Sequence, residues 1–113
     1  MIVSLPWPAR ILSPNARAHW ARLAVAKRSA KSQAYWLTRA EKPGIASAAP
    51  LLSLEFRPPD NRRRDLDNAL ASCKAALDGI AEAMGCDDHT FRLAARMGEP
   101  LPPHGAVIVT VTP

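Results

Sequence analysis

The sequence predicts a small α+β domain, because short apolar segments of the kind found in strands alternate with two longer segments of helical periodicity. The chain has 113 residues, enough for one hydrophobic core. Apolar residues make up 48% of it, which favours a globular domain over a disordered chain. We expect the order β-α-β-α-β-β, with one small mixed sheet and two main helices. We expect a single domain over residues 1–113, without repeats or an internal boundary.

The chain is expected to begin with a strand and a long helix. Ile2 to Leu5 predicts a short strand, and a loop containing Pro and Asn follows it to about Ala16. Between Arg17 and Arg39, apolar residues recur at three- and four-residue steps, as on one face of a helix. The expected core face of this helix consists of Trp20, Leu23, Ala26, Ala30, Ala34 and Leu37.

The rest of the chain predicts three strands and a second helix. Leu51 to Phe56 indicates a strand, and a charged loop leads from it to a helix that begins near Asp65 and runs to about Met84. Gly85 suits the end of that helix. Its expected apolar face consists of Leu66, Leu70, Cys73, Leu77, Ile80 and Met84. Residues 91–97 and 107–111 predict the last two strands.

The charge of the chain favours a polyanionic partner. The formal net charge is +5, and most of the 15 basic residues are arginines, which form forked contacts with phosphate. No apolar run approaches the ~20 residues needed to cross a bilayer, and residues 1–8 do not resemble a signal peptide. The spacing of Cys73 and Cys86 predicts two reduced thiols. We therefore expect a cytoplasmic protein that binds nucleic acid and no membrane.

Acidic residues gather within this basic chain. Asp65 and Asp67 directly follow three arginines, and Asp87-Asp88 follow the second helix. Clustered carboxylates repel one another unless a cation lies between them, and Mg²⁺ prefers such oxygen ligands. A bound metal could activate water for attack on a phosphodiester. The alternative is structural, with Asp65 as the N-cap of the second helix and Asp67 in its first turn.

Other polar residues near the acids have two interpretations each. Lys74 lies seven residues after Asp67, so in one continuous helix both share a face. Lys74 either stabilises developing charge or is an exposed helical lysine. Asn68 either orients an acid and contacts phosphate or is a second capping residue. Three arginines spaced by 11 form either a phosphate-contacting or a solvated helix face, namely Arg17, Arg28 and Arg39.

These residues resemble the RusA-type Holliday-junction resolvases, which are common in phages and prophages. The resemblance rests on the run Arg62-Arg63-Arg64-Asp65-Leu66-Asp67-Asn68, on Lys74-Ala75-Ala76-Leu77-Asp78 and on Asp87-Asp88. Leu5-Pro6-Trp7-Pro8 and residues 13–20 (SPNARAHW) are similar to the phage-borne branch, so the likeness spans residues 5–88. The gap between Asp67 and Lys74 is longer than in the best-known branch by roughly one helical turn.

The resemblance implies a homodimeric, Mg²⁺-dependent endodeoxyribonuclease of DNA recombination and repair, with Mn²⁺ as a possible substitute. Such an enzyme binds four-way DNA junctions and makes paired cuts in strands of like polarity, without an organic cofactor. The implied catalytic and metal-binding acids are Asp65, Asp67 and Asp88, with Asp87 in support, and the implied catalytic lysine is Lys74. The residues expected to contact nucleic acid are Arg62, Arg63, Arg64, Asn68, Arg17 and Arg28.

Two rival functions stay open at this point. The first is a phage DNA-binding module without enzymatic activity, in which the acidic cluster is structural. Metal-dependent cleavage discriminates between this module and the nuclease. The second is an RNA-processing or general structure-specific nuclease, which a panel of substrates would separate from a resolvase. An interaction protein without nucleic acid leaves the charge arrangement unexplained.

Overall fold

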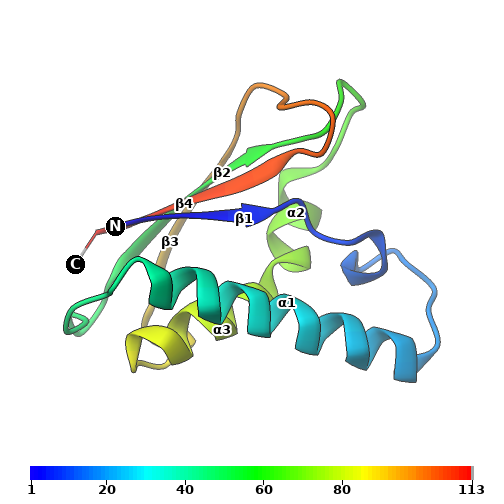
Figure 1. Cartoon of the computed structure of the whole chain (residues 1–113). Helices are drawn as coiled ribbons and strands as arrows, with labels where there is room; N and C mark the ends of the chain where they lie inside the picture. The colour runs from blue at the N-terminus through cyan, green and yellow to red at the C-terminus, as the bar shows by residue number, and fades with distance from the viewer. Residues whose placement is uncertain (113) are drawn as a thin grey trace.

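A four-stranded mixed sheet forms one layer of the protein, and helices form the other (Figure 1). The structure is a computed structural model that describes residues 1–112. Its elements are β1 (Ile2–Pro6), α1 (Trp20–Ala40), β2 (Leu51–Arg57), α2 (Leu66–Ser72), α3 (Lys74–Met84), β3 (Arg92–Met97) and β4 (Ala106–Thr112). Two short 3₁₀ turns span Arg10–Leu12 and Asp88–Thr90. The predicted α+β class is confirmed, with one helix more than expected.

The strands lie in the order β1-β4-β2-β3. Strand β4 runs antiparallel to both of its neighbours, whereas β2 and β3 are parallel. Parallel neighbours need a crossover connection, and α2 and α3 provide it. The segment that carries most of the predicted acids is therefore this crossover, which joins one end of the sheet to the other.

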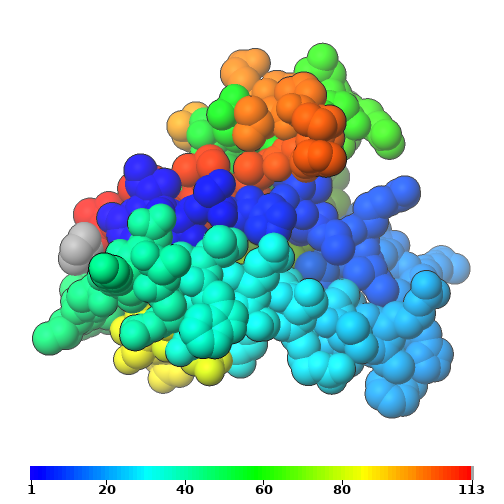
Figure 2. Space-filling model, viewed as in Figure 1, coloured from blue at the N-terminus to red at the C-terminus, as the bar shows by residue number. Residues whose placement is uncertain are grey.

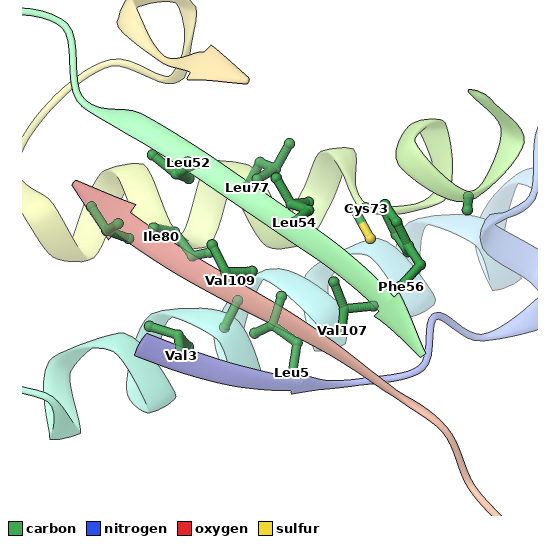
Figure 3. Packing of buried hydrophobic residues seen from close by; sticks show 13 residues of the cluster. Val3, Leu5, Leu52, Leu54, Phe56, Cys73, Leu77, Ile80, Val107 and Val109 are labelled. Atoms are coloured by element: carbon green, nitrogen blue, oxygen red, sulfur yellow. The ribbon is translucent and has the colours of Figure 1, made fainter. Parts of the chain in front are cut away.

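The core follows from alternating residues in three strands. Strand β2 alternates between buried and partly buried positions, as its period of two residues requires. The strand residues of the core are Val3, Leu5, Leu52, Leu54, Phe56, Val107, Val109 and Val111. Figure 3 shows these side chains directed towards the helices, where Cys73, Leu77 and Ile80 meet them. Burial of this cluster fixes which face of the crossover helices points inward.

Helices α1 and α3 pack closely against each other on the same face of the sheet (Figure 1). Gly79 allows the close approach, because a Cβ atom at this position would lie 2.2 Å from the backbone oxygen of Lys31. An ion pair of 3.2 Å joins Lys31 to Glu82 across the contact. Arg39 donates from Nη1 to the backbone oxygen of Ala83 at 3.4 Å. Arg39 therefore links the two helices.

The first helix begins later than the sequence pattern predicts. His19 is its N-cap, and the His19 Nδ1 accepts a hydrogen bond of 3.2 Å from the backbone N–H of Ala21. Arg17 consequently precedes the helix, so the three arginines spaced by 11 do not share one helical face. The expectation that Trp20 belongs to the core is also wrong. Trp20 is 75% exposed, because the first turn of α1 extends beyond the sheet that would cover it.

The second predicted helix is two helices that meet at Cys73. The backbone of Cys73 leaves the helical region with φ −95° and ψ 4°, and its N–H bonds to the oxygen of Leu70. The Cys73 side chain is buried, which keeps the junction fixed in the core. The end at Gly85 is confirmed, since this residue adopts a left-handed conformation with φ 72°. Among residues 1–112, no helix combines the length and apolarity needed to cross a membrane.

Candidate functional site

A wide hollow of about 880 Å³ lies beside the start of α1, and five arginines line it. Its walls come from the loop after β1, the first turn of α1, and the loop that leads into α2. Figure 2 shows the loop after β1 (blue) beside the start of α1 (lighter blue) at one end of the molecule. We call this hollow the arginine cleft, and its arginines are Arg10, Arg17, Arg22, Arg63 and Arg64.

The arginine cleft is suited to an anionic ligand. Asp65 is the one acidic residue among its lining residues, which include five arginines. Asn15 and Asn68 add neutral donors to the same walls. Arginine, asparagine and backbone N–H groups are the usual partners of nucleic-acid phosphates. The cleft therefore has the charge and the donors that a phosphate backbone requires.

Asp60 organises the loop between β2 and α2. Its Oδ1 accepts from the backbone N–H of Arg62 at 2.9 Å and from Arg64 Nη1 at the same distance. Its Oδ2 pairs with Arg62 Nε at 3.2 Å. The backbone hydrogen bond from Arg62, followed by the bond from Arg64, lowers the pKa of the Asp60 carboxyl. The carboxylate of Asp60 thus offsets part of the positive charge of Arg62 and Arg64, which helps the chain to hold three adjacent arginines before a helix.

The three adjacent arginines have different environments. Arg64 donates from Nη1 to the backbone oxygens of Asp60 and Arg62, and its guanidinium lies 5.5 Å from the centre of the Trp7 ring. Only 21% of its side chain is exposed, compared with 81% for Arg62. Arg63 lines the cleft and is exposed. Arg64 therefore has a structural role at the cleft wall, while the side chain of Arg63 stays exposed in the cleft.

The acids at the start of α2 lie within reach of Asn68. Asp65 is the N-cap of α2 by position, but its side chain makes no capping hydrogen bond. Its Oδ2 instead accepts from Asn68 Nδ2 at 3.4 Å. Asp67 Oδ1 accepts from the backbone N–H of Asn68 at 3.0 Å. The predicted positions of Asp65 at the N-cap and of Asp67 in the first turn are confirmed, although Asp65 makes no capping hydrogen bond. Asn68 contacts an acid, as one of its two interpretations predicts.

Lys74 lies between two carboxylates at the start of α3. Its Nζ donates to Asp78 Oδ1 at 2.6 Å and also bonds to Asp88 Oδ2. These bonds, first to Asp78 and then to Asp88, raise the pKa of Lys74. The bond to Lys74 is the main cause that lowers the pKa of Asp88. Asp88 thus lies at the start of α3.

The predicted acids consequently form two groups instead of one. Asp65 and Asp67 lie at the start of α2, whereas Asp88 lies with Lys74 beyond its end. The seven residues of α2 correspond to roughly 10 Å of helix. Within residues 1–112, no three His, Cys, Asp or Glu side chains are close enough to hold one metal ion. The set Asp65, Asp67 and Asp88 therefore does not fit Mg²⁺ as a preformed three-carboxylate site.

The break at Cys73 places Asp67 and Lys74 on different helices. The shared face of Asp67 and Lys74 was predicted for one continuous helix, and that prediction is wrong because the helix ends between them. Ser72 Oγ donates to the backbone oxygen of Asn68 at 2.8 Å, which completes the last turn of α2. Lys74 is then the first residue of α3, so the geometry of α3 sets where its side chain points.

A second basic hollow of about 450 Å³ lies next to the arginine cleft. Its charged residues are Lys27, Arg28, Lys31, Lys74 and Asp78, and we call it the lysine cleft. Both hollows share Ile11, Ser13, Ala16 and Ser72 in their linings, so they lie on the two sides of the segment 11–16. Arg17 lines the first hollow and Arg28 the second. Together the two clefts make a basic surface with a carboxylate in each.

Several residues of this surface were not predicted from the sequence. Asp78 lies four residues after Lys74, which is the spacing of a helical ion pair and was a usable signal. Asp60 lies two residues before Arg62, which is the spacing of a local turn. Arg10 and Arg22 had no such signal, because only the tertiary fold brings their segments to the cleft. His89 belongs to the turn after α3, and its Nδ1 lies 3.8 Å from Asp87 Oδ2.

The fold and the two clefts define a class, a small basic α+β protein with two adjacent hollows lined by arginine and lysine. No family model matches the chain. A protein from Xylella fastidiosa (strain Temecula1 / ATCC 700964), described as an uncharacterized protein, is 37% identical over 114 residues. The match covers 97% of this chain and 74% of the relative. The chain belongs to the same family as this Xylella fastidiosa protein.

Proposed function

We propose that the protein is a structure-specific endodeoxyribonuclease that cuts four-way DNA junctions by Mg²⁺-dependent hydrolysis of phosphodiester bonds. The observation that carries the proposal is the arginine cleft, in which Asp65 and Asn68 lie among five arginines. The carboxylate of Asp65 would lie close to a phosphate bound by these arginines, where Mg²⁺ could bridge the two groups. The RusA-type resemblance of the same residues supplies the reaction and the substrate.

The lysine cleft supports the second half of the proposal. Lys74, the lysine that the resemblance implies for catalysis, lines this cleft and bonds to Asp88, one of the implied acids. Both hollows are open and adjacent, so one nucleic-acid backbone could contact both. Mg²⁺ commonly needs one or two protein carboxylates when substrate phosphates and water complete its shell. A preformed site of three acids is therefore not a requirement of the proposal.

A homodimer belongs to the same proposal. A two-fold dimer presents two identical sites, which explains paired cuts in a junction that is itself nearly two-fold. The face of the sheet opposite α1 and α3 bears no helix in residues 1–112 (Figure 1).

The test uses a labelled synthetic four-way junction, a matched linear duplex and Mg²⁺. We expect paired, symmetrical cuts in the junction alone, and we expect Asp67→Asn to bind the junction without cutting it. Glu99→Gln is the control, because Glu99 is an exposed acid that lines neither cleft and has no implied part in catalysis. An Asp67→Asn variant that cuts at the parental rate would contradict the assignment of this residue.

A DNA-binding module without enzymatic activity is the second candidate. The observation that favours it is the engagement of the acids with protein partners, Asp88 with Lys74 and Asp65 with Asn68. Tight, salt-dependent junction binding without cutting, in Mg²⁺ and in Mn²⁺, would support this candidate. A panel with RNA and flapped substrates would separate the resolvase from a general structure-specific nuclease.

A further inference from the structure

We infer that the aromatic pair His19–Trp20, at the rim of the arginine cleft, stacks an unpaired nucleobase of the nucleic acid bound in that cleft. The inference rests on the proposed nucleic-acid binding, and it specifies which class of nucleic acid the cleft binds. The favoured ligand is a strand with at least one base that is unpaired or unstacked near the bound phosphates, as at an open branch point.

Trp20 is unusual because it is large, aromatic and uncovered. It is 75% exposed, although tryptophan is one of the side chains that gains most from burial. It is the first residue of α1, and the arrangement of the elements leaves that end of the helix beyond the sheet (Figure 1). The fold therefore holds an indole ring in solvent next to a hollow that is rich in arginine.

The ring of Trp20 is oriented by its neighbour. The centroids of the His19 and Trp20 rings are 5.5 Å apart, and their planes are inclined by 32°. His19 is itself fixed, since its Nδ1 accepts the capping hydrogen bond from Ala21. His19 also lines the arginine cleft, whereas Trp20 lies outside the lining. The pair thus extends from the wall of the cleft to its rim as a partly ordered aromatic surface.

Charge complementarity favours a nucleic acid as the occupant, because the arginines attract its phosphates and the exposed rings beside them can stack a base. Arg17 and Arg22 flank the pair in sequence, and both line the cleft. A cationic groove that follows the backbone, with aromatic rings beside it, is the arrangement by which proteins hold single strands. A second copy of this chain would bring its own net charge of +5 to this surface, which opposes such a contact.

The test compares Trp20→Ala with Trp36→Ala in binding to a four-way junction and to a single-stranded oligonucleotide. Trp36 is the matched control, since it is 66% exposed on the same helix but lies roughly 24 Å further along the axis. We expect Trp20→Ala to weaken binding about tenfold, as the loss of one stacked base does. Trp36→Ala should leave affinity unchanged, and Trp20→Phe should restore most of it.

Two further readouts separate stacking from other roles. The slope of affinity against salt should stay the same in Trp20→Ala, because that slope counts phosphate contacts. In a Trp36→Phe background, the remaining tryptophans are Trp20 and Trp7, and Trp7 lines the cleft. A single-stranded oligonucleotide should quench their emission, and the additional change Trp20→Phe should leave only the quenching of Trp7.

The outcomes distinguish this inference from the proposal on which it rests. Salt-dependent binding by the parent, with equal affinity in Trp20→Ala and Trp36→Ala, would overturn the stacking role and leave the proposed function intact. A change of oligomeric state in Trp20→Ala, measured by sedimentation, would identify a second copy as the occupant and would also overturn it. Absence of any nucleic-acid binding by the parent would overturn both.

Discussion

At the scale of single residues, neighbouring positions of like chemistry have unlike roles. The arginine run shows this most clearly. Arg62 and Arg64 bond to Asp60, Arg64 also contacts Trp7, and Arg63 faces the cleft. The sequence predicts a uniform phosphate-contacting role for the run, because three arginines in a row carry no signal of which one folds back. That signal depends on Asp60 and Trp7, and Trp7 lies in a different segment of the chain.

The difference between Arg64 and Arg63 can be measured. We expect Arg64→Ala to lower the free energy of unfolding by about 1 kcal/mol, because it removes backbone hydrogen bonds and the contact with the Trp7 ring. Arg63→Ala should change stability by less than about 0.5 kcal/mol, as exposed substitutions do. Urea unfolding of both variants is the measurement. Equal stability of the two variants would show that Arg64 is not a structural residue.

Cys73 shows the same principle for an apolar site. Burial raises the pKa of its thiol to about 12, so the group stays neutral and acts as a small hydrophobic side chain at the helix junction. The sequence correctly places Cys73 on an apolar helix face. It does not indicate the break there, because the residues on both sides of Cys73 continue the helical pattern.

At the scale of elements, the contact between α1 and α3 holds the crossover in place, and Gly79 is its critical residue. A glycine within an exposed helix normally makes replacement by alanine favourable by up to about 1 kcal/mol. At Gly79 the added Cβ would meet the backbone oxygen of Lys31 at 2.2 Å, and backbone atoms cannot move aside cheaply. The tertiary contact therefore reverses the sign of the substitution.

We expect Gly79→Ala to destabilise the protein by about 1–3 kcal/mol, the usual cost of overpacking. Thermal unfolding should show this as a clear fall in Tm. Gly44→Ala is the matched control, because no atom lies within 4 Å of the position of its added Cβ. The control should be neutral or slightly stabilising, through the smaller entropy of the unfolded chain. A Gly79→Ala variant with an unchanged Tm would mean that the helices can separate without cost.

At the scale of the whole molecule, local patterns predicted the elements and the tertiary fold decided the site. The four strands were predicted to within a residue or two at each end, because alternation along Leu52, Leu54 and Phe56 records which face is buried. The arginine cleft was not predicted as a unit, since Arg10, Arg22 and Arg63 come from three segments. Asp65 and Asp88 were grouped by their chemistry and by the resemblance, and the length of α2 separates them.

The ion pair between Lys74 and Asp88 connects α3 to the turn before β3, and it makes stability depend on pH. Bonding to Lys74 lowers the pKa of Asp88 below its ordinary value of 3.8. A carboxyl with a lowered pKa in the folded state binds protons more readily when the chain unfolds. Its contribution is therefore present above the ordinary value and is lost as the pH falls through the lower, folded-state value. The effect is small, because the Lys74 side chain is 64% exposed and that of Asp88 33% exposed, so solvent screens the pair.

We expect Asp88→Asn to have a Tm a few degrees or less below the parent at neutral pH, and the two proteins to converge as the pH falls well below 3.8. Asp87→Asn is the control for a lost charge at the neighbouring position, since Asp87 does not bond to Lys74. The measurement is Tm as a function of pH for all three proteins. A constant difference between Asp88→Asn and the parent over the whole range would show that the charge of Asp88 is not involved. A difference that grows in acid would reverse the assigned sign, and the ion pair would then not contribute to the folded state.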